Sequence, residues 1–379
     1  MKMVVSASWE DLPADPIGLV LLRLPSLADR VRLRASCRPW RAAAKQMKPP
    51  LPPPLPWLAF RDGSIVDLDG APVRCAPILR DVVFRYLAVD NSAFLIHDDG
   101  ACSLMNPLSG LTPPLPKIAP VVYRAIDRYY FLPTISTQNN ARQGERCCHL
   151  CLQESRCCQY ISMCPESNQL PPTRHAKDIS FLNGKLYALT EYEGLWSIKH
   201  SSLMPISSVN LNHRYAFISA SQKTPRSTKY TGALTPINSN SESNGRLLMI
   251  RRWMAFPRKV WLGTQDRTSR FEVLEADLST VPGQWVKVDN LDGQAIFLSI
   301  QCSKSVIAGQ SAGVQADCIY FMHRVVDSPY DDHYWKNPLG DSGVYNMRDK
   351  EIKPLLRDAV MEELKRKKQF LTWFFPVDA

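Results

Sequence analysis

Hydrophobic residues change their spacing near residue 50 of the chain. Before that point they recur every three or four positions, a spacing that predicts helices. The first helix begins at Asp15-Pro16, because aspartate caps free backbone N–H groups and proline fits the first helical position, and it ends at Pro25. A second helix begins at Ser26 and a third follows Pro39. The apolar positions of the first two helices are Ile17, Val20, Leu21, Leu24, Leu27, Val31 and Ala35.

After Trp57 short apolar runs alternate with Gly, Asp and Asn turns, which predicts strands. In Leu182 to Thr190 an Asn-Gly pair separates two such runs and predicts a β-hairpin. Similar strand, turn, strand units lie at 94–107, at 246–277 and at 317–347. One unit of this kind cannot cover both of its faces, so the units must stack, and a β-propeller is the usual closed arrangement. A β-sandwich or mixed sheet is the alternative.

The segment between the two patterns, Pro49 to Pro56, has the sequence PPLPPPLP. It predicts a polyproline II conformation about 25 Å long, at about 3.1 Å per residue. We interpret it as a semi-rigid spacer between a helical part and a strand part. The spacing Pro50-x-x-Pro53 would also suit docking by an SH3 or WW domain.

Composition narrows the class of protein. With 45% hydrophobic and 22% charged residues, the chain of 379 residues can bury a core and is not disordered throughout. Its net charge of +10 favours nucleic acid, anionic lipid or acidic protein surfaces as partners. Neither a signal peptide nor a bilayer-spanning run is found, so the sequence predicts an intracellular protein of the nucleus or cytoplasm, without membrane contact. Its 11 cysteines are then reduced thiols.

The helical part resembles an F-box. The resemblance is carried, in the family's order, by Trp9-x-x-Leu12-Pro13, Ile17, Leu24-Pro25 and Arg32-Leu33-x-x-x-Cys37-Arg38-x-Trp40-Arg41. Asp15-Pro16 and Ser36 depart mildly from the family pattern. The resemblance implies binding to a Skp-type adaptor and, through it, to a cullin–RING ubiquitin ligase. It implies that the adaptor buries an exposed apolar stripe formed by Leu12, Pro13, Ile17, Leu24, Pro25 and Leu27, while Trp40 is internal.

The strand part resembles the KIB-type, kelch-like β-propeller of plant F-box proteins. The blocks that carry this resemblance are HDDGACSLMNPLSG, KDISFLNGKLYAL, NGRLLMIRRW, FEVLEADLSTVPGQWVKVDNLDGQAIFLS, SVIAGQ with DCIYFM, DSGVYNMRD and WFFP. It extends from Trp57 to Pro376 and implies a domain that presents a target protein for degradation. We therefore expect a small all-α F-box at 8–48, a linker at 49–56 and an all-β propeller at 57–379. The expected protein is a non-catalytic ligase subunit without cofactor or metal, and its target cannot be named from the sequence.

Residues 124–173 depart from this family pattern and contain the cysteine-rich run CCHLCLQESRCCQYISMC. Cys148-x-x-Cys151 with Cys157, Cys158 and Cys164 could converge on zinc, but the second half lacks a clean Cys-x-x-Cys. We interpret the segment as a divergent, poorly ordered insert that leaves one blade incomplete.

The sequence leaves two other functions as alternatives. Gly309 to Gly313, GQSAG, matches the nucleophile elbow of serine hydrolases, with His323 or His333 as the base for Ser311. No helix is predicted after it, so we expect a loop between two strands. A basic nucleic-acid-binding protein is the other alternative. Lys365 to Lys368 resembles a nuclear localisation signal, but a basic helix end is an equal explanation.

The two ends of the strand part are both short and aromatic. Trp57 to Phe60 follows the proline segment, and Phe370 to Pro376 closes the chain. A circular array must join its ends or leave sheet edges that invite aggregation. We therefore expect these two runs to meet in one blade or in adjacent blades, with the basic helix before Phe370 outside the ring.

Overall fold

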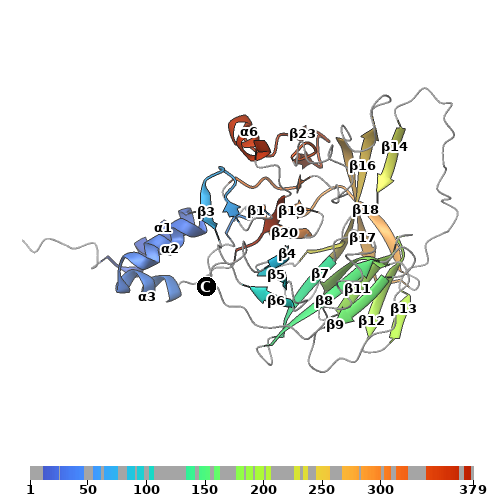
Figure 1. The fold of residues 1–379 in the computed structure, drawn as a ribbon, viewed down its shortest axis with the longest axis horizontal. Helices are drawn as coiled ribbons and strands as arrows, with labels where there is room; N and C mark the ends of the chain where they lie inside the picture. The colour runs from blue at the N-terminus through green and yellow to red at the C-terminus, as the bar shows by residue number, and fades with distance from the viewer. Residues whose placement is uncertain are drawn as a thin grey trace, which may run out of the picture.

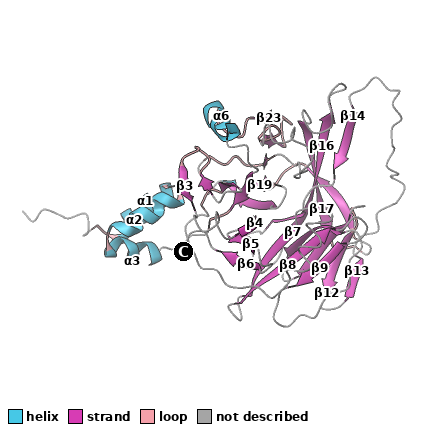
Figure 2. Ribbon diagram, viewed as in Figure 1, coloured by secondary structure: helices cyan, strands magenta, loops and turns pink. Residues whose placement is uncertain are grey.

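The structure is a computed structural model. It describes residues 12–24, 26–46, 54–60, 64–75, 83–89, 92–97, 102–105, 134–140, 145–153, 158–162, 176–182, 185–190, 193–199, 202–205, 226–230, 234–237, 245–256, 267–280, 283–299, 303–308, 313–322, 339–366 and 371–376. Helices lie at one end of the molecule and strands make up most of the rest (Figures 1 and 2). Among the residues described, no helix has the length and apolar character needed to cross a membrane.

Three helices form a small unit at the start of the chain, which we call the helical unit (residues 12–46). They are α1 (Ala14–Arg23), α2 (Leu27–Ser36) and α3 (Arg38–Gln46). Their order confirms the prediction from apolar spacing, but α1 begins at Ala14 with Pro13, and not Asp15, at its N-cap. Helix α3 begins at Arg38, so Pro39 lies in its first turn, where no helical hydrogen bond is lost. Ile17, Leu21 and Ala43 are buried between the helices, and Trp40 packs at the margin of this cluster.

The first three sheets use the strands from the proline segment to Ser162, together with the last strand of the chain. The first sheet has the order β24-β1-β2-β3, the second β4-β5-β6 and the third β7-β8-β9. Their strands are β1 (Trp57–Phe60), β2 (Ser64–Val66), β3 (Pro72–Cys75), β24 (Leu371–Phe374), β4 (Val83–Val89), β5 (Ser92–His97), β6 (Cys102–Met105), β7 (Thr134–Asn140), β8 (Glu145–Gln153) and β9 (Cys158–Ser162).

The remaining three sheets follow in chain order. The fourth is β10-β11-β12-β13, the fifth is β14-β16-β17-β18 with β15 also paired to β16, and the sixth is β20-β19-β21-β22-β23. Their strands are β10 (Ala176–Leu182), β11 (Lys185–Thr190), β12 (Leu195–Lys199), β13 (Ser202–Pro205), β14 (Arg226–Tyr230), β15 (Leu234–Ile237), β16 (Arg246–Phe256), β17 (Arg267–Asp277), β18 (Gln284–Val288), β19 (Gln294–Leu298), β20 (Ser303–Ile307), β21 (Cys318–Phe321), β22 (Gly343–Asn346) and β23 (Ile352–Lys353). The predicted hairpin at Leu182 is confirmed, since Leu182 pairs with Lys185.

Contacts between neighbouring sheets return to their starting point. β24 contacts β4, β4 contacts β7, β7 contacts β10, β10 contacts β15, and β15 contacts β20. The circuit closes between the sixth sheet and the first, where the Trp373 Nε1–H donates to the Leu298 carbonyl oxygen at 3.2 Å. The Ser299 and Thr372 hydroxyls hydrogen-bond beside it at 3.0 Å. The described sheets therefore form a circular stack, which we call the ring.

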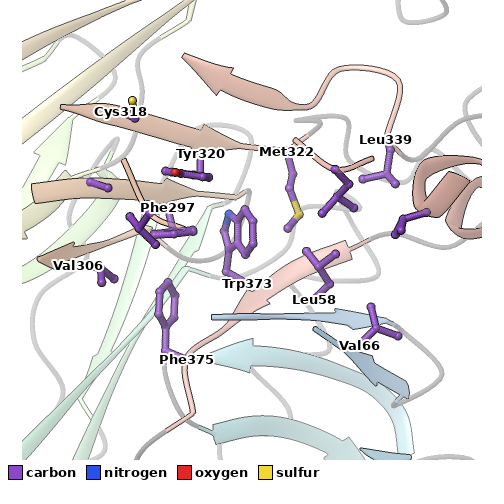
Figure 3. Close-up of a cluster of buried hydrophobic side chains, with 14 of the residues drawn as sticks. Leu58, Val66, Phe297, Val306, Cys318, Tyr320, Met322, Leu339, Trp373 and Phe375 are labelled. Carbon is purple, nitrogen blue, oxygen red and sulfur yellow. The ribbon is translucent and has the colours of Figure 1, made fainter. Parts of the chain in front are cut away.

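The largest apolar cluster fills the junction between the first and sixth sheets (Figure 3). Trp373 is fully buried, and its ring meets the Phe297 ring edge to face, with centroids 4.9 Å apart. Phe297 stacks in turn on Tyr320, at 4.6 Å. Such aromatic pairs contribute stability beyond the burial of their apolar area because of their ring quadrupoles.

The two ends of the strand part pair with each other, as predicted. β1 and β24 are antiparallel, with Trp57 opposite Phe374 and Leu58 opposite Trp373. The helix before β24, α6 (Asp358–Arg366), lies on the outside of the ring (Figure 1) and buries Val360 and Leu364 against the junction cluster. The expectation that both chain ends hold the ring together is therefore confirmed.

Two regions differ from the expectations. The cysteine-rich segment supplies β8 and β9, which pair with β7 in an antiparallel sheet, instead of the poorly ordered insert that we expected. Cysteine packs as a small apolar residue and is compatible with strands. The proline segment is described only from Pro54, and there Pro54 and Pro56 are buried while Leu55 packs on the junction cluster. Its end is thus part of the ring and not a free spacer.

Candidate interaction surfaces

The helical unit leaves large apolar side chains open to solvent. On α1 they are Leu19, Val20 and Leu22, which are 59%, 44% and 43% exposed, and on α2 it is Val31, at 51%. The sequence of α1, ADPIGLVLLR, is apolar around most of its circumference. One side of α1 carries Ile17 and Leu21, which pack in the internal cluster. The opposite side of α1 is not covered by the described residues of the helical unit. An exposed apolar group of this kind marks a protein-binding surface.

The six residues that the F-box resemblance assigned to adaptor binding are placed differently from one another. Ile17 is 2% exposed, inside the helical unit. Leu12 and Leu24 are half-buried, and Pro13 is exposed. Leu27 is 2% exposed, against the ring. Pro25 lies outside the described residues. The stripe Leu12, Pro13, Ile17, Leu24, Pro25 and Leu27 is therefore not an exposed surface as a whole.

The residues actually exposed could be found only in part from sequence. Val20 is one of the apolar positions that helical spacing predicted for the first helix, but Leu19 and Leu22 are not among them. A helix that is apolar on two sides gives no periodic signal that says which side meets the core and which meets a partner. The signal that was available is the uninterrupted run Leu19 to Leu22 itself.

Leu27 fixes the helical unit to the ring. It lies at the first position of α2 and packs in one cluster with Trp57, Ala59 and Phe374 of the first sheet. At the same turn the Arg30 side chain, 1% exposed, donates from Nε to the Leu24 carbonyl oxygen at 2.7 Å. The unit therefore contacts the sheet that both chain ends build, and Figure 1 shows α1 and α2 next to β3.

The charge of the helical unit is strongly positive. Its exposed basic residues are Arg23, Arg32, Arg38, Arg41 and Lys45. Its acidic residues are Asp15 and Asp29, and Asp29 is used in an ion pair with Arg32 at 2.8 Å. A partner with an apolar centre and an acidic margin matches this surface, because complementary potentials speed association and disfavour wrong partners.

Buried ion pairs connect the sheets of the ring. Arg252 of the fifth sheet is paired with Asp341 at 2.6 Å and donates to the Met322 carbonyl oxygen at 2.9 Å. Thr268 donates from its backbone N–H and its hydroxyl to the same carboxylate. Burial lowers the pKa of Arg252, and Asp341 opposes that change. Every polar atom of this group is used internally, so it is a structural link and not a binding site.

A second link joins the fourth and fifth sheets. Arg251 donates from Nε to a Glu193 carboxylate oxygen at 3.0 Å, and from Nη1 to Glu272 at 2.9 Å. The Trp285 indole N–H donates to the Glu193 carbonyl oxygen at 2.8 Å. Glu193 itself has a φ of 64°, a conformation that costs a non-glycine residue free energy. These contacts hold the turn before β12 against the fifth sheet.

The residues raised as catalytic or metal-binding candidates contribute little to the described structure. Ser311, His323 and His333 lie outside the described residues. What is described after β20 is a turn at Gly313, with φ of 91°, that leads into β21. The described residues contain no group of three or more His, Cys, Asp or Glu side chains that could hold a metal. The side chains of Cys147 to Cys164 are not among those described.

Comparison with known proteins gives one family. The family described as KIB1-4 beta-propeller matches residues 79–346, which is more than half of the chain. The match begins after the first sheet's strands β1 to β3 and ends before α6 and β24. It is narrower than the resemblance from Trp57 to Pro376, and it includes the cysteine-rich segment. No curated protein matches the chain.

Proposed function

The chain belongs to the KIB1-4 β-propeller family, and from that premise we propose that it is the target-recruiting subunit of an SCF-type cullin–RING ubiquitin ligase. A propeller of this family is a protein-interaction domain. In the proposal the helical unit is an F-box that binds a Skp-type adaptor, and the ring binds the protein to be ubiquitinated. The chain itself performs no catalysis in this scheme.

The observation that carries the proposal is the exposure of four large apolar side chains of the helical unit, which are Leu19, Val20 and Leu22 on α1 and Val31 on α2. Fully covering one such side chain contributes about 1.5–3 kcal/mol, so a partner that covers several gains an appreciable affinity. Leu27 attaches the unit to the ring, which supports a role in which one partner is held at a defined position relative to another.

The test is co-purification of the full chain with a recombinant Skp-type adaptor. The double variant Leu19→Asp/Leu22→Asp places charges on the open surface without touching the internal cluster of Ile17 and Leu21. Since each leucine contributes about 1.5–3 kcal/mol when covered, and 1.4 kcal/mol corresponds to a factor of ten, we expect affinity to fall at least a hundredfold. Ile17→Asp is unsuitable, because a charge inside the cluster would unfold the unit.

A matched control is available in the ring. Leu278 and Val286 are 40% and 46% exposed, so Leu278→Asp/Val286→Asp makes a comparable change at remote positions. This control should bind the adaptor as the unmodified chain does. Adaptor binding that survives Leu19→Asp/Leu22→Asp, or that both double variants weaken equally, would contradict the proposal.

A further inference from the structure

The fifth sheet is longer than its neighbours. β16 and β17 have 11 residues each, against 7 for β10 and 5 for β19 in the adjacent sheets. The first part of β16 pairs with β15, which contacts the neighbouring sheets on both sides. The second part pairs instead with β14. In Figure 1 β14 and this part of β16 stand at the margin of the ring, so the sheet projects there.

A tryptophan and two arginines share one face of this projecting end. Arg270 pairs with Trp253 across β16 and β17, and Arg267 pairs with Ala255. Arg267 and Arg270 are three positions apart, which in a regular strand would place them on opposite faces. The register shift between Trp253 and Met254 adds one residue on β17, so both arginines come to the Trp253 face. Both are exposed.

The opposite face of the same strands is closed. Arg252, Met254 and Thr268 point there and are buried around Asp341. Further along the face that carries Trp253, Arg251 forms ion pairs with the carboxylates of Glu193 and Glu272. Within the part of the chain that the structure describes, Arg270 makes no such ion pair, and its contact is with the Trp253 ring. Of the acidic groups described near this end of the sheet, Glu193 and Glu272 pair with Arg251 and Asp341 pairs with Arg252, so none of these three is paired with Arg270.

The contact with Trp253 prepares Arg270 to bind an anion. The guanidinium carbon lies 4.6 Å from the centroid of the indole ring, which holds the side chain in place by a cation–π interaction. A guanidinium carries five N–H donors in a planar fork, and a cation–π contact through its face leaves the fork edge for a bidentate carboxylate. Less side-chain entropy is lost on binding because the arginine is already restrained. The indole N–H of Trp253 is buried, so the tryptophan contributes its ring alone.

We propose that the projecting end of the fifth sheet, formed by Trp253, Arg267 and Arg270, is a docking surface for an acidic segment of another protein. Assigning that segment to the protein recruited for ubiquitination rests on the proposed function; the binding itself does not. A nucleic acid fits less well. Its phosphate chain needs a continuous basic track, and along this face the next side chains are the carboxylates of Glu193 and Glu272.

The experiment uses the full chain and a short fluorescent peptide in which glutamates alternate with serine and glycine. Binding is followed by fluorescence anisotropy at low salt, where a surface ion pair contributes most. Arg270→Glu should weaken binding at least tenfold, and Arg270→Lys, which keeps the charge but not the planar fork, severalfold. A peptide with glutamines in place of the glutamates should not bind measurably.

Arg357→Glu is the matched control, because Arg357 is also an exposed arginine, 73% open, but lies near Asp69 on the first sheet's side of the ring. It should leave peptide binding within twofold. Equal losses in Arg270→Glu and Arg357→Glu would show a general effect of net charge and overturn the proposal. So would unchanged binding by Arg270→Glu with an unchanged melting temperature.

Two further outcomes complete the test. If a single-stranded oligonucleotide displaces the peptide at equal charge concentration and loses affinity equally in Arg270→Glu, the surface is for nucleic acid and the proposal is wrong. Adaptor co-purification separates this proposal from the previous one. Arg270→Glu should retain the adaptor, and Leu19→Asp/Leu22→Asp should retain the peptide, so either proposal can fail alone.

Discussion

The helical unit and the junction between the first and sixth sheets cover their apolar residues in opposite ways. Among the described residues, the helical unit buries three apolar side chains in its own cluster, Ile17, Leu21 and Ala43. The junction buries Trp373, Phe297 and many others in a cluster built by strands from both ends of the chain. Large apolar side chains remain outside on α1 of the helical unit, whereas every described residue of β1, β19 and β21 is buried. Among the described residues, the junction therefore buries its large apolar side chains within the ring, whereas the helical unit leaves several of its own exposed.

The strand β1 is where the two regions meet. Its four residues, WLAF, are all buried. Trp57 and Ala59 face Leu27 of the helical unit, and Leu58 and Phe60 face the junction. β24 divides in the same way, since Phe374 belongs to the first cluster and Trp373 to the second. The sheet that closes the ring is therefore also the platform for the helical unit.

Breaking the junction should have the largest effect. Trp373→Ala removes a fully buried indole that meets the Phe297 ring edge to face and donates a hydrogen bond to the Leu298 carbonyl oxygen. Large-to-small changes of this kind cost about 3–5 kcal/mol. We expect the midpoint of urea unfolding, followed by tryptophan fluorescence, to fall accordingly, and the purified variant to aggregate. Val286→Ala, at an exposed position, should stay within about 0.5 kcal/mol. A stable, soluble Trp373→Ala would mean that the ring does not depend on its closing strand.

Breaking the contact between the two regions should cost less. Leu27→Ala removes the side chain that packs on Trp57 and Phe374, and the expected loss is about 2–4 kcal/mol at this interface. The ring should remain folded, so its urea midpoint changes little. Limited proteolysis should instead cut faster in the proline segment, because the helical unit would be free to move away. Val31→Ala, on the exposed side of α2, is the control and should leave cleavage unchanged. Equal cleavage in Leu27→Ala would show that the proline segment alone fixes the unit.

How much of this could be predicted varies with the kind of pattern. The helices and the hairpin at Leu182 followed from spacing and turn residues, which act locally. The pairing of Trp57 with the C-terminal run followed from the need of a circular array to join its ends. The attachment of the helical unit to the ring did not. The run WLAF, apolar at every position, was the available sign that both faces of β1 are covered. The proline segment predicted instead that the helical part and the strand part are held apart.

The surface residues were harder still. Which side of α1 stays open depends on how Ile17 and Leu21 pack against Ala43 of α3, and periodicity on one helix does not contain that information. The face shared by Trp253 and Arg270 depends on a register shift between the consecutive strands β16 and β17. An arginine, tryptophan or threonine in a strand gives no sign of a bulge, so the grouping appears only once the strands are paired.

The smallest expected effect concerns the chemical reactivity of one cysteine thiol in each of the two regions. Cys37, between α2 and α3, is half-buried, whereas Cys318 in β21 is buried in the junction cluster. Burial raises the pKa of the Cys318 thiol, with the nearby charge of Asp317 adding to the effect, so little of the reactive thiolate forms at neutral pH. We expect iodoacetamide to label Cys37 in the native protein and Cys318 only after unfolding, as measured by peptide mass spectrometry.

The raised pKa of the Cys318 thiol also gives the sign of a small effect of pH on stability. The folded state holds the proton more tightly than the unfolded chain, so this group's contribution to stability is complete below the ordinary thiol pKa and is lost as pH rises through the folded-state pKa. Cys318→Ser should remove that part of the alkaline decline, and Cys37→Ser should not. Native labelling of Cys318 at the rate of Cys37 would show that the junction opens as readily as the helical unit. The two regions would then not differ in how well they protect a thiol.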